Sequence, residues 1–454
     1  MKIAIIGGGA SGMMCAIASK KNKTNEVFLI EQNEKLGKKI FITGKGRGNL
    51  TNACDKDTFF SNVVSNKKFL YSSFNQFSNE DLMTFFKNAG LDLNIERGNR
   101  VFPKSNKAYS ITDCIKKLLY KNNIKIILDT KVLNIDILND TLGKDNNTNE
   151  NNRFILTLKN KNNKIYKMDF DKVVVATGGA SYSSTGSTGD GYKFAKNLGI
   201  NVTKIYPSLV PIEISFRNEY LKRAFKNADN LLLKNISMKI SKANTNKILY
   251  EDFGEIEIMP YGFSGATILS ASSFIYDKFD EGLTLHIDLK PALSIEKLDE
   301  RILRDIKEFN NISFFYELKK LLPNDFIDIF IIKYLENLTI KNYEKSLGKQ
   351  DNIKTQIENI KNKKISSLSK EERLTLINSL KNLEFNIKKS RSFNEAIITK
   401  GGIDIKEINP KTMESKKIKN LYFIGEVLDI DCLTGGFNMQ VAFTTGYVAG
   451  NNLN

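Results

Sequence analysis

The hydrophobic pattern is clearest at the start of the chain. Residues Lys2–Ile6 form a short apolar run, a glycine-rich turn interrupts it, and an apolar helical segment follows to about Ser19. A second apolar run, Glu26–Ile30, ends at Glu31. Two short apolar runs that flank a helix are typical of a βαβ unit. The chain therefore predicts a parallel sheet.

Helical and strand-like apolar segments continue to alternate over roughly the next 170 residues. We predict helices at Asn79–Ala89 and from Ser110 to about Lys121. Strands are predicted at Ile124–Ile135, Arg153–Lys159 and Lys172–Ala176. Between these elements we predict a basic loop at Glu96–Ser110 and a solvent loop at Asn139–Asn152.

The pattern changes at about Asn201. Short β-rich segments such as Ile236–Lys242 and Leu283–Leu289 extend to Pro291, and a helical pattern with a cap at Ser369 follows. Strands then return at Glu384–Ile387 and Ala396–Thr399. The predicted parts are one domain in two segments at 1–200 and 396–454, an inserted β-rich domain at 201–293 and 381–395, and a helical module at 294–380. The fold class is α/β.

Composition limits the cellular setting. The 454 residues include four cysteines without CxxC spacing, so neither a disulfide framework nor a metal site is predicted. No run of about eighteen apolar residues is present, and the first apolar run is too short for a signal peptide. We expect a cytoplasmic protein without a membrane span.

Charge favours a polyanionic partner. The net charge is +17, and the stretch 341–391 holds 13 Lys and Arg against 6 Asp and Glu. An AT-rich genome that places lysine on the surface would give the same excess, and a solvated helix face would explain the basic stretch equally well. Charge alone leaves both readings open.

The first glycine turn predicts dinucleotide binding. Gly7, Gly9 and Gly12 fit G-x-G-x-x-G between a strand and a helix, and Glu31 follows 19 residues after the last glycine. In such turns the helix N-terminus meets a pyrophosphate, and the acidic residue accepts hydrogen bonds from a ribose.

Two later segments favour FAD over NAD. Val173–Gly179 predicts a second strand beneath the dinucleotide, and Leu421–Asp429 ends another strand with Gly425 and Glu426. Gly435 and Gly436 then open an apolar helix, whose N-terminus would face the flavin pyrimidine ring, although a plain helix-entry turn is the alternative. The glycine-rich stretch Gly37–Asn52 predicts a flavin-side loop, for which a flexible surface turn is an equal reading.

Several stretches resemble one known family. GKKIFITGKGRGNLTN, GNRVFPKSNKA, ATGGASYSSTGSTGDGYKFA, YGFSGATIL and GEVLDIDCLTGGFNMQVAF are similar to the FAD-binding flavoproteins that include aminoacetone oxidase, a bile-acid dehydro-intermediate reductase and a synthase of dihydrouridine in large-subunit ribosomal RNA. The family loop usually reads GGGRCN, whereas this chain has Lys45 for a glycine and Gly48 for the cysteine.

The resemblance implies a Rossmann-like FAD domain built from both chain ends, a β-rich insert and a helical cap. With the motifs, it predicts that FAD is bound by Gly7, Gly9, Ala10, Ser11, Gly12, Glu31, Gln32, Lys39, Gly44, Gly46, Arg47, Gly48, Asn49, Val132, Thr177, Gly178, Gly179, Gly425, Glu426, Asp429, Gly436, Phe437, Asn438 and Gln440.

The resemblance leaves the substrate open, because family members differ. We favour NAD(P)H-driven reduction of a uridine C5=C6 bond to dihydrouridine in 23S (large-subunit) rRNA, with NAD(P)H binding transiently because no second G-x-G-x-x-G is visible. The predicted RNA-binding residues share one basic loop: Arg97, Arg100, Lys104 and Lys107. The alternatives are a small-molecule flavin oxidase or reductase for an amine or enone, and a flavin-bearing RNA-binding factor without catalysis.

The proton donor is the least determined part. Cys432 lies between the Glu426 segment and the Gly435 turn, although a buried inert cysteine is an alternative reading. Tyr261 and Ser264 are further candidates. The only histidine, His286, lies in a predicted strand, so catalysis by histidine is not expected.

Overall fold

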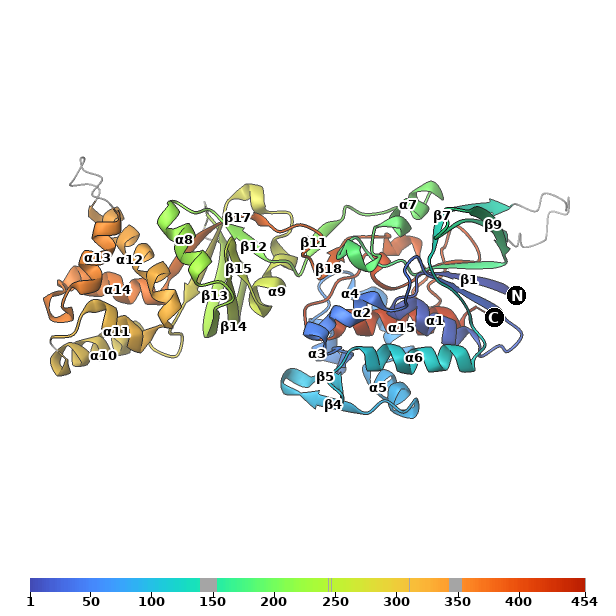
Figure 1. The fold of residues 1–454 in the computed structure, drawn as a ribbon, viewed down its shortest axis with the longest axis horizontal. Helices are drawn as coiled ribbons and strands as arrows, with labels where there is room; N and C mark the ends of the chain where they lie inside the picture. The colour runs from blue at the N-terminus through green and yellow to red at the C-terminus, as the bar shows by residue number, and fades with distance from the viewer. Residues whose placement is uncertain (139–152, 244, 246, 310, 343–352, 454) are drawn as a thin grey trace. The chain divides into compact units, whose positions relative to one another are not determined.

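The chain folds into two compact units (Figure 1). The computed structural model describes residues 1–138, 153–243, 245, 247–309, 311–342 and 353–453. The first unit comprises Met1–Ser208 and Ser392–Asn454, and the second comprises Leu209–Arg391. Each unit has its own hydrophobic core. The loop predicted at Asn139–Asn152 lies outside the described residues, and the domain roles assigned from the sequence stay predictions.

A five-stranded parallel sheet forms the centre of the first unit. Its strands are β19 (Leu421–Phe423), β10 (Lys172–Val175), β1 (Lys2–Ile6), β2 (Glu26–Ile30) and β6 (Lys125–Ile127), in that order across the sheet. The predicted bounds of the first two strands match those observed. The single strand predicted at Ile124–Ile135 is wrong, because Asp129 has a positive φ of 50° and separates β6 from β7 (Thr130–Leu138).

Helices from the two ends of the chain pack directly against each other beneath this sheet. They are α1 (Ala10–Ser19) and α15 (Phe437–Asn451), which lie beside α6 (Tyr109–Lys121) in Figure 1. A Cβ on Gly446 would lie 2.3 Å from the Ser11 carbonyl oxygen. Only glycine allows this approach, so the first unit depends on residues from both ends of the sequence.

Smaller elements surround the central sheet. The helices are α2 (Lys38–Ile42), α3 (Lys56–Ser61), α4 (Lys67–Gln76), α5 (Asn79–Asn88) and α7 (Asp190–Asn197). One small sheet holds β3 (Thr51–Asn52), β5 (Arg100–Pro103) and β4 (Leu93–Glu96), and a second holds β7, β8 (Arg153–Asn160) and β9 (Ile165–Phe170). A third small sheet pairs β11 (Tyr206–Ser208) with β18 (Ile398–Lys400). The basic segment Glu96–Ser110 is therefore not a plain loop, because β5 pairs with both β3 and β4.

The second unit is a closed antiparallel barrel with a helical insertion. The barrel strands are, in spatial order, β12 (Ile212–Ile214), β15 (Gly262–Ser264), β14 (Ile248–Met259), β13 (Leu232–Lys242), β16 (Leu283–Asp288) and β17 (Leu383–Ser390), with α8 (Glu219–Asn227) and α9 (Ala266–Ile275) also in this unit. Between β16 and β17 come α10 (Ile295–Glu308), α11 (Phe314–Leu321), α12 (Ile327–Asn342), α13 (Ile353–Asn362) and α14 (Lys370–Lys381).

The predicted cap at Ser369 is present. Its hydroxyl accepts from the Glu372 amide at 3.1 Å, and the Glu372 carboxylate accepts from the Ser369 amide at 2.8 Å. This reciprocal capping box satisfies two backbone donors at the start of α14. Among the described residues, no helix is both long enough and apolar enough to cross a membrane.

Candidate functional site

The three glycines of the first turn have different local environments. A Cβ on Gly7 would lie 2.4 Å from the Ala176 carbonyl oxygen, and one on Gly12 would lie 2.0 Å from that of Gly7. A Cβ on Gly9 would meet no atom within 4 Å. The outer glycines therefore allow strand and helix to approach, and Gly9 keeps the space before the N-terminus of α1 open. This geometry fits a dinucleotide pyrophosphate.

Glu31 lies beside this turn at the end of β2. Its Oε2 atom accepts from the Gly8 amide at 2.7 Å, and its Oε1 atom accepts from the Asn33 amide and side chain at 2.9 and 2.6 Å. The carboxylate is thus oriented by the turn itself. The neighbouring Gln32 donates to the Gly186 carbonyl at 2.6 Å, which connects this strand end to the loop after β10.

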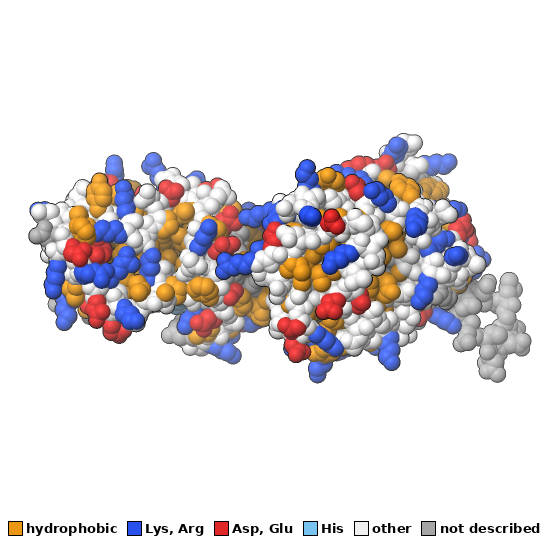
Figure 2. Space-filling model, turned by 90° about the horizontal axis from the view of Figure 1, so that it is seen from below, with side chains coloured by type: hydrophobic (Ala, Val, Ile, Leu, Met, Phe, Trp, Pro, Cys, Tyr) orange, Lys and Arg blue, Asp and Glu red, His pale blue; other side chains and the backbone are white. Residues whose placement is uncertain are grey.

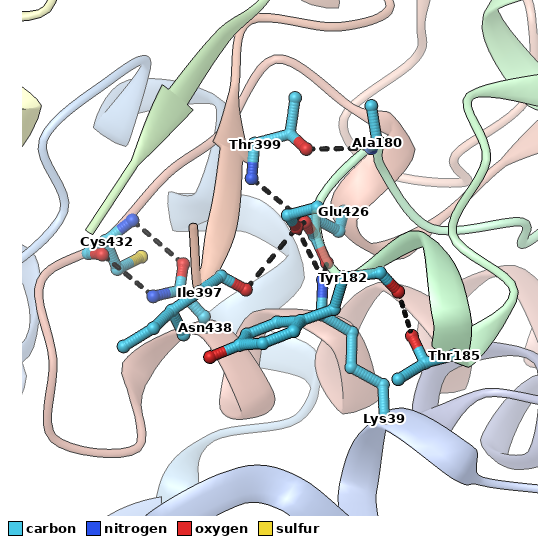
Figure 3. Close-up of polar contacts among 10 residues, drawn as sticks. Lys39, Ala180, Tyr182, Thr185, Ile397, Thr399, Glu426, Cys432 and Asn438 are labelled. Atoms are coloured by element: carbon cyan, nitrogen blue, oxygen red, sulfur yellow. Dashed lines mark hydrogen bonds and ion pairs between the residues drawn. The ribbon is translucent and has the colours of Figure 1, made fainter. Parts of the chain in front are cut away.

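A partly buried polar cluster centres on Glu426 (Figure 3). The Lys39 ammonium lies 2.6 Å from Glu426 Oε2, and Oε1 accepts from the Ser181 hydroxyl at 2.8 Å and the Thr399 amide at 3.0 Å. Gly179 must be glycine here, because its Cβ would lie 2.8 Å from the same carboxylate. The cluster joins four segments at the carboxyl edge of the sheet, where doubly wound folds bind ligands.

Sequence reasoning found Lys39, Gly179 and Glu426 in this cluster but missed Ser181 and Thr399. Ser181 occurs in a stretch with several serines and threonines, and nothing in its spacing singles it out. Thr399 contributes its backbone amide to Glu426, while its hydroxyl accepts from the Ala180 amide at 2.8 Å. The strand end before Gly401 and Gly402 was the only available signal for Thr399.

Tyr182, which follows the cluster in sequence, was also missed. Its backbone is left-handed, with φ 51° and ψ 59°, which is unusual for a bulky residue. The conformation is held because the Tyr182 amide donates to the Phe393 carbonyl, and the Tyr182 carbonyl accepts from the Thr185 amide and hydroxyl, both at 2.8 Å. In Figure 3 its ring extends from beside Lys39 toward the side on which Asn438 lies. Burial, and then the Glu395 charge, raise the pKa of the Tyr182 hydroxyl, so it stays protonated at neutral pH.

The turn that opens α15 is held by its own side chains. The Asn438 side chain accepts from the Cys432 amide at 2.9 Å and donates to the Cys432 carbonyl at 2.8 Å. Gln440 is buried and accepts from the Thr51 hydroxyl at 2.6 Å, and the Phe437 ring packs 5.5 Å from that of Phe59. These three predicted cofactor residues therefore shape the turn in this structure, and α15 begins without a side-chain cap.

The Gly44–Asn49 loop explains one of the two departures from the family pattern, the glycine at position 48. Lys45 has a φ of 57°, a conformation that glycine adopts at lower cost. Gly48 has a φ of 77°, and a Cβ there would lie 2.8 Å from the Ala108 Cα and the Ile111 Cδ1 atoms. A cysteine at this position would require the backbone to move.

Two buried polar atoms in the predicted cofactor set have no partner among the described residues. They are the Asn49 Oδ1 and Thr177 Oγ1 atoms. Burying such an atom unpaired costs free energy, so an added donor at either place is favourable. Together with the space at Gly9, these atoms fit a polar cofactor along the sheet edge. Within the described residues, no group of His, Cys, Asp or Glu is arranged to hold a metal ion.

The remaining predicted cofactor residues lie around the same edge. Ser11 is next to Gly425, whose Cβ would lie 2.5 Å from the Ser11 hydroxyl, and Gly178 has a φ of 71° after β10. Val132 is buried in β7. Asp429 accepts from the Thr203 hydroxyl at 3.2 Å, and burial raises the pKa of its carboxyl.

A buried ion pair lies just beyond Asp429. The Lys400 ammonium lies 3.0 Å from the Asp431 carboxylate and donates to the Ser65 hydroxyl at 2.6 Å. The Asp431 carbonyl also accepts from the amides of Val64 and Ser65. The pair therefore fixes the segment that leads into the Gly435 turn.

The three candidate proton donors occupy different places. Cys432 is fully buried, and this burial raises the pKa of its thiol, so the thiol is neutral and shielded from solvent. Tyr261 and Ser264 lie in the second unit, around the β14–β15 turn, where the Arg391 guanidinium lies 4.3 Å from the centre of the Tyr261 ring. All three assignments stay predictions.

The basic segment lies against the Gly435 turn within the first unit. Arg97, Arg100, Lys104 and Lys107 are exposed on the β4–β5 hairpin and the residues after it. The Asn52 side chain donates both to the Gly98 carbonyl at 3.0 Å, in this hairpin, and to the Gly435 carbonyl at 3.1 Å. One amide group thus connects the hairpin to the turn that opens α15.

Arg47 connects the same hairpin to the glycine-rich loop. Its guanidinium bonds to the Glu96 carboxylate and to the Asn106 Oδ1 atom at 2.6 Å, and it lies 4.2 Å from the centre of the Phe102 ring. Arg47 was predicted to bind cofactor, but in this structure its donors face the hairpin.

The chain matches known proteins over nearly its whole length. The family model described as HI0933-like protein Rossmann domain matches residues 1–452. The 3-dehydro-bile acid delta(4,6)-reductase of Clostridium scindens is 27% identical over 99% of this chain and 98% of that protein. The ribosomal RNA dihydrouridine synthase of Haemophilus influenzae is 26% identical over 98% of this chain and 96% of that protein, and that of Escherichia coli is 25% identical over 99% and 97%.

A solved structure shows the same fold. The 3-ketosteroid delta1-dehydrogenase from Sterolibacterium denitrificans superposes with a TM-score of 0.51 at 13% identity, over 99% of this chain and 98% of that one. The α/β fold with a Rossmann-like sheet and an added β-rich part is therefore confirmed. The chain belongs to the HI0933-like family of FAD-dependent oxidoreductases with a Rossmann-type FAD-binding domain.

Proposed function

We propose that this protein uses NAD(P)H to reduce the C5=C6 bond of a uridine in 23S (large-subunit) rRNA to dihydrouridine. The observation that carries the proposal is the position of the basic hairpin. It presents Arg97, Arg100, Lys104 and Lys107, and Asn52 joins it to the Gly435 turn at the flavin side of the predicted site. A polyanion held by the hairpin would therefore lie beside the cofactor.

The charges of the hairpin differ in their pairing from several of those in the helical module. In the described part of the chain, no carboxylate forms an ion pair with any of those four side chains, because Glu96 is already bonded to Arg47. In the helical module, by contrast, Lys361, Lys363, Arg373 and Lys381 each pair with an acidic side chain. Figure 2 likewise shows basic and acidic side chains lying next to one another over the second unit. Unpaired cations attract phosphates more strongly, which favours the hairpin over the basic stretch 341–391 as the RNA contact.

The chemistry requires a hydride at C6 and a proton at C5 of uracil. Bound FAD would supply the hydride-transfer chemistry between NAD(P)H and C6. The turn at Gly9, the carboxylate of Glu31 and the Lys39–Glu426 pair would hold it along the sheet edge. The target base must leave its stack to reach this edge, which costs a few kcal/mol that phosphate contacts on the hairpin can offset.

Tyr182 is our added candidate for the proton donor. As C5 gains its hydrogen, the Tyr182 O–H bond would break, and the phenolate left behind would regain a proton from water. Burial raises the pKa of this hydroxyl, so its proton is present at neutral pH. General-acid groups of this kind contribute about 10²- to 10⁴-fold to rates.

A second candidate function is supported by one comparison. The relative from Clostridium scindens is named as a reductase of a small steroid, so reduction of a small enone by this chain is the alternative. It predicts turnover of a free enone without RNA, whereas our proposal predicts none. A flavin-bearing RNA-binding factor without catalysis predicts a yellow protein that NADPH and NADH fail to reduce.

The decisive experiment is deletion of the gene followed by mass spectrometry of dihydrouridine in large-subunit rRNA. We expect one dihydrouridine to disappear and to return with the wild-type gene. The variant Arg97→Glu with Lys104→Glu should fail to restore it, and Lys23→Glu, an exposed change elsewhere in the first unit, should restore it fully. Unchanged dihydrouridine after deletion would refute the proposal.

A further inference from the structure

Exposed aromatic rings and lysines alternate on one side of α11 in the second unit. The Tyr316 and Phe309 side chains are 60% and 44% exposed, and Phe315 is half-buried. The Lys319 ammonium lies 4.7 and 5.1 Å from the ring centres of Phe315 and Tyr316, and that of Lys320 lies 3.8 Å from the centre of Phe309. We call Phe309, Phe315, Tyr316, Lys319 and Lys320 the α11 face.

The core does not need these rings. The opposite side of α11 carries Phe314, Leu318 and Leu321, which are 0, 0 and 3% exposed and pack inside the helical module. Residues 315, 316, 319 and 320 share the outer side because positions three and four apart are neighbours on a helix. Two exposed aromatic rings beside lysines are therefore a surface property and not a by-product of packing.

Charge decides what kind of partner suits this surface. Lys319 forms no ion pair in the described part of the chain, whereas Lys320 lies 3.4 Å from the buried Glu317 carboxylate. Lys361 lies 5.7 Å from the Phe315 ring centre and adds a third ammonium beside the rings, although it also pairs with Asp328. An apolar protein face would leave these ammonium groups desolvated, whereas a nucleic-acid strand offers both phosphates for the lysines and bases for the rings.

We propose that the α11 face binds an unpaired segment of the rRNA substrate, with bases stacked on Tyr316 and Phe309 and phosphates beside Lys319 and Lys320. This inference rests on the proposed function for the identity of the RNA. It adds a second RNA-binding surface, in the second unit, to the hairpin of the first. Stacking of this type tolerates any base, so the face would provide affinity and leave sequence choice to other parts of the protein.

The test is binding of 23S rRNA to the purified full chain by filter retention at several KCl concentrations. Tyr316→Ala with Lys319→Glu should weaken binding about tenfold to a hundredfold, since each stacked base contributes by that order. The slope of log affinity against log salt should become less steep by about 0.7 for each phosphate that the variant no longer binds. The matched control is Tyr220→Ala with Lys226→Glu on α8, also in the second unit, which should bind as wild type.

Each outcome separates this inference from the proposed function. Wild-type affinity and salt slope in the α11 variant would overturn the inference. A loss of affinity seen with assembled large subunits but not with naked rRNA would also overturn it, because the partner would then be a protein. If deletion leaves dihydrouridine unchanged but the variant still loses rRNA affinity, only the catalytic proposal fails. Circular dichroism checks that the variants fold. If the double variant is unstable, the exposed single change Lys319→Ala replaces it, and the measurement is then the salt slope of rRNA binding.

Discussion

Removing the charge of Asp431 is expected to destabilise the first unit strongly. The side chains of Lys400 and Asp431 are only 9% and 0% exposed. At an effective dielectric constant of about 20, unit charges at their 3.0 Å separation attract by about 5 kcal/mol. Asp431→Asn leaves the ammonium buried, with the Ser65 hydroxyl as a neutral partner. Loss of one member of such a pair typically costs about 3–5 kcal/mol.

The expected cost lies at the low end of this range. Burial raises the pKa of the Asp429 carboxyl and the Lys400 charge opposes this rise, so a second acidic group lies near enough to compensate partly for the uncovered ammonium. We expect about 3 kcal/mol. For a unit of this size that corresponds to a fall in Tm of roughly 5 °C.

The assay is thermal unfolding followed by far-UV circular dichroism, because the chain contains no tryptophan. The control is Asp169→Asn, which removes the exposed partner of both Lys2 and Arg153 and should change Tm little. The double variant Lys400→Met with Asp431→Asn should regain most of the lost Tm. A fall of under about 2 °C for Asp431→Asn, or no recovery in the double variant, would refute the reasoning.

Three further changes test the site and the barrel. Gly9→Val should lower FAD affinity at least tenfold, as measured by flavin fluorescence titration. The Tm of the apoprotein should not change, since a Cβ at position 9 meets nothing within 4 Å. Gly12→Ala should instead fail to fold well, because its Cβ would lie 2.0 Å from the Gly7 carbonyl oxygen. Glu426→Gln should weaken FAD binding about tenfold or more in the same titration, and equal affinity would contradict its assigned role. The hydrogen bond from Glu384 raises the pKa of His286 above 6.5. The stability from this contact is therefore full below pH 6.5 and is lost as pH rises through the folded pKa. His286→Gln should flatten this fall in stability with pH, and proton NMR of the single histidine reports its pKa.

Local sequence patterns predicted the elements that depend on local sequence. The first two strands, the glycine turn and the Ser369 cap were found because each is set by a few adjacent residues. The strand at Arg100–Pro103 was missed because its hydrogen-bond partners, β3 and β4, are needed to make it one. The break at Asp129 was missed because an apolar run conceals a single positive φ.

The candidate site shows the same limit. Lys39 and Glu426 were named from motifs, but their separation of 387 residues gave no sign that they pair, and Ser181 had no motif at all. Charge counting indicated the helical module as the basic surface. Pairing of Lys361 with Asp328, and of Lys381 with Asp288, is a matter of three-dimensional distance that composition cannot report.

The close packing of α1 on α15 has a consequence for protein synthesis. The second unit is one continuous stretch, Leu209–Arg391, so all of it is synthesised before β19 and α15. The first unit must meanwhile wait with an open sheet edge at β10 and an uncovered apolar helix at α1. Its nascent half is thus the part most in need of chaperone protection. A ribosome that stalls after Arg391 but before β19 would release a chain with a finished barrel and an incomplete cofactor domain.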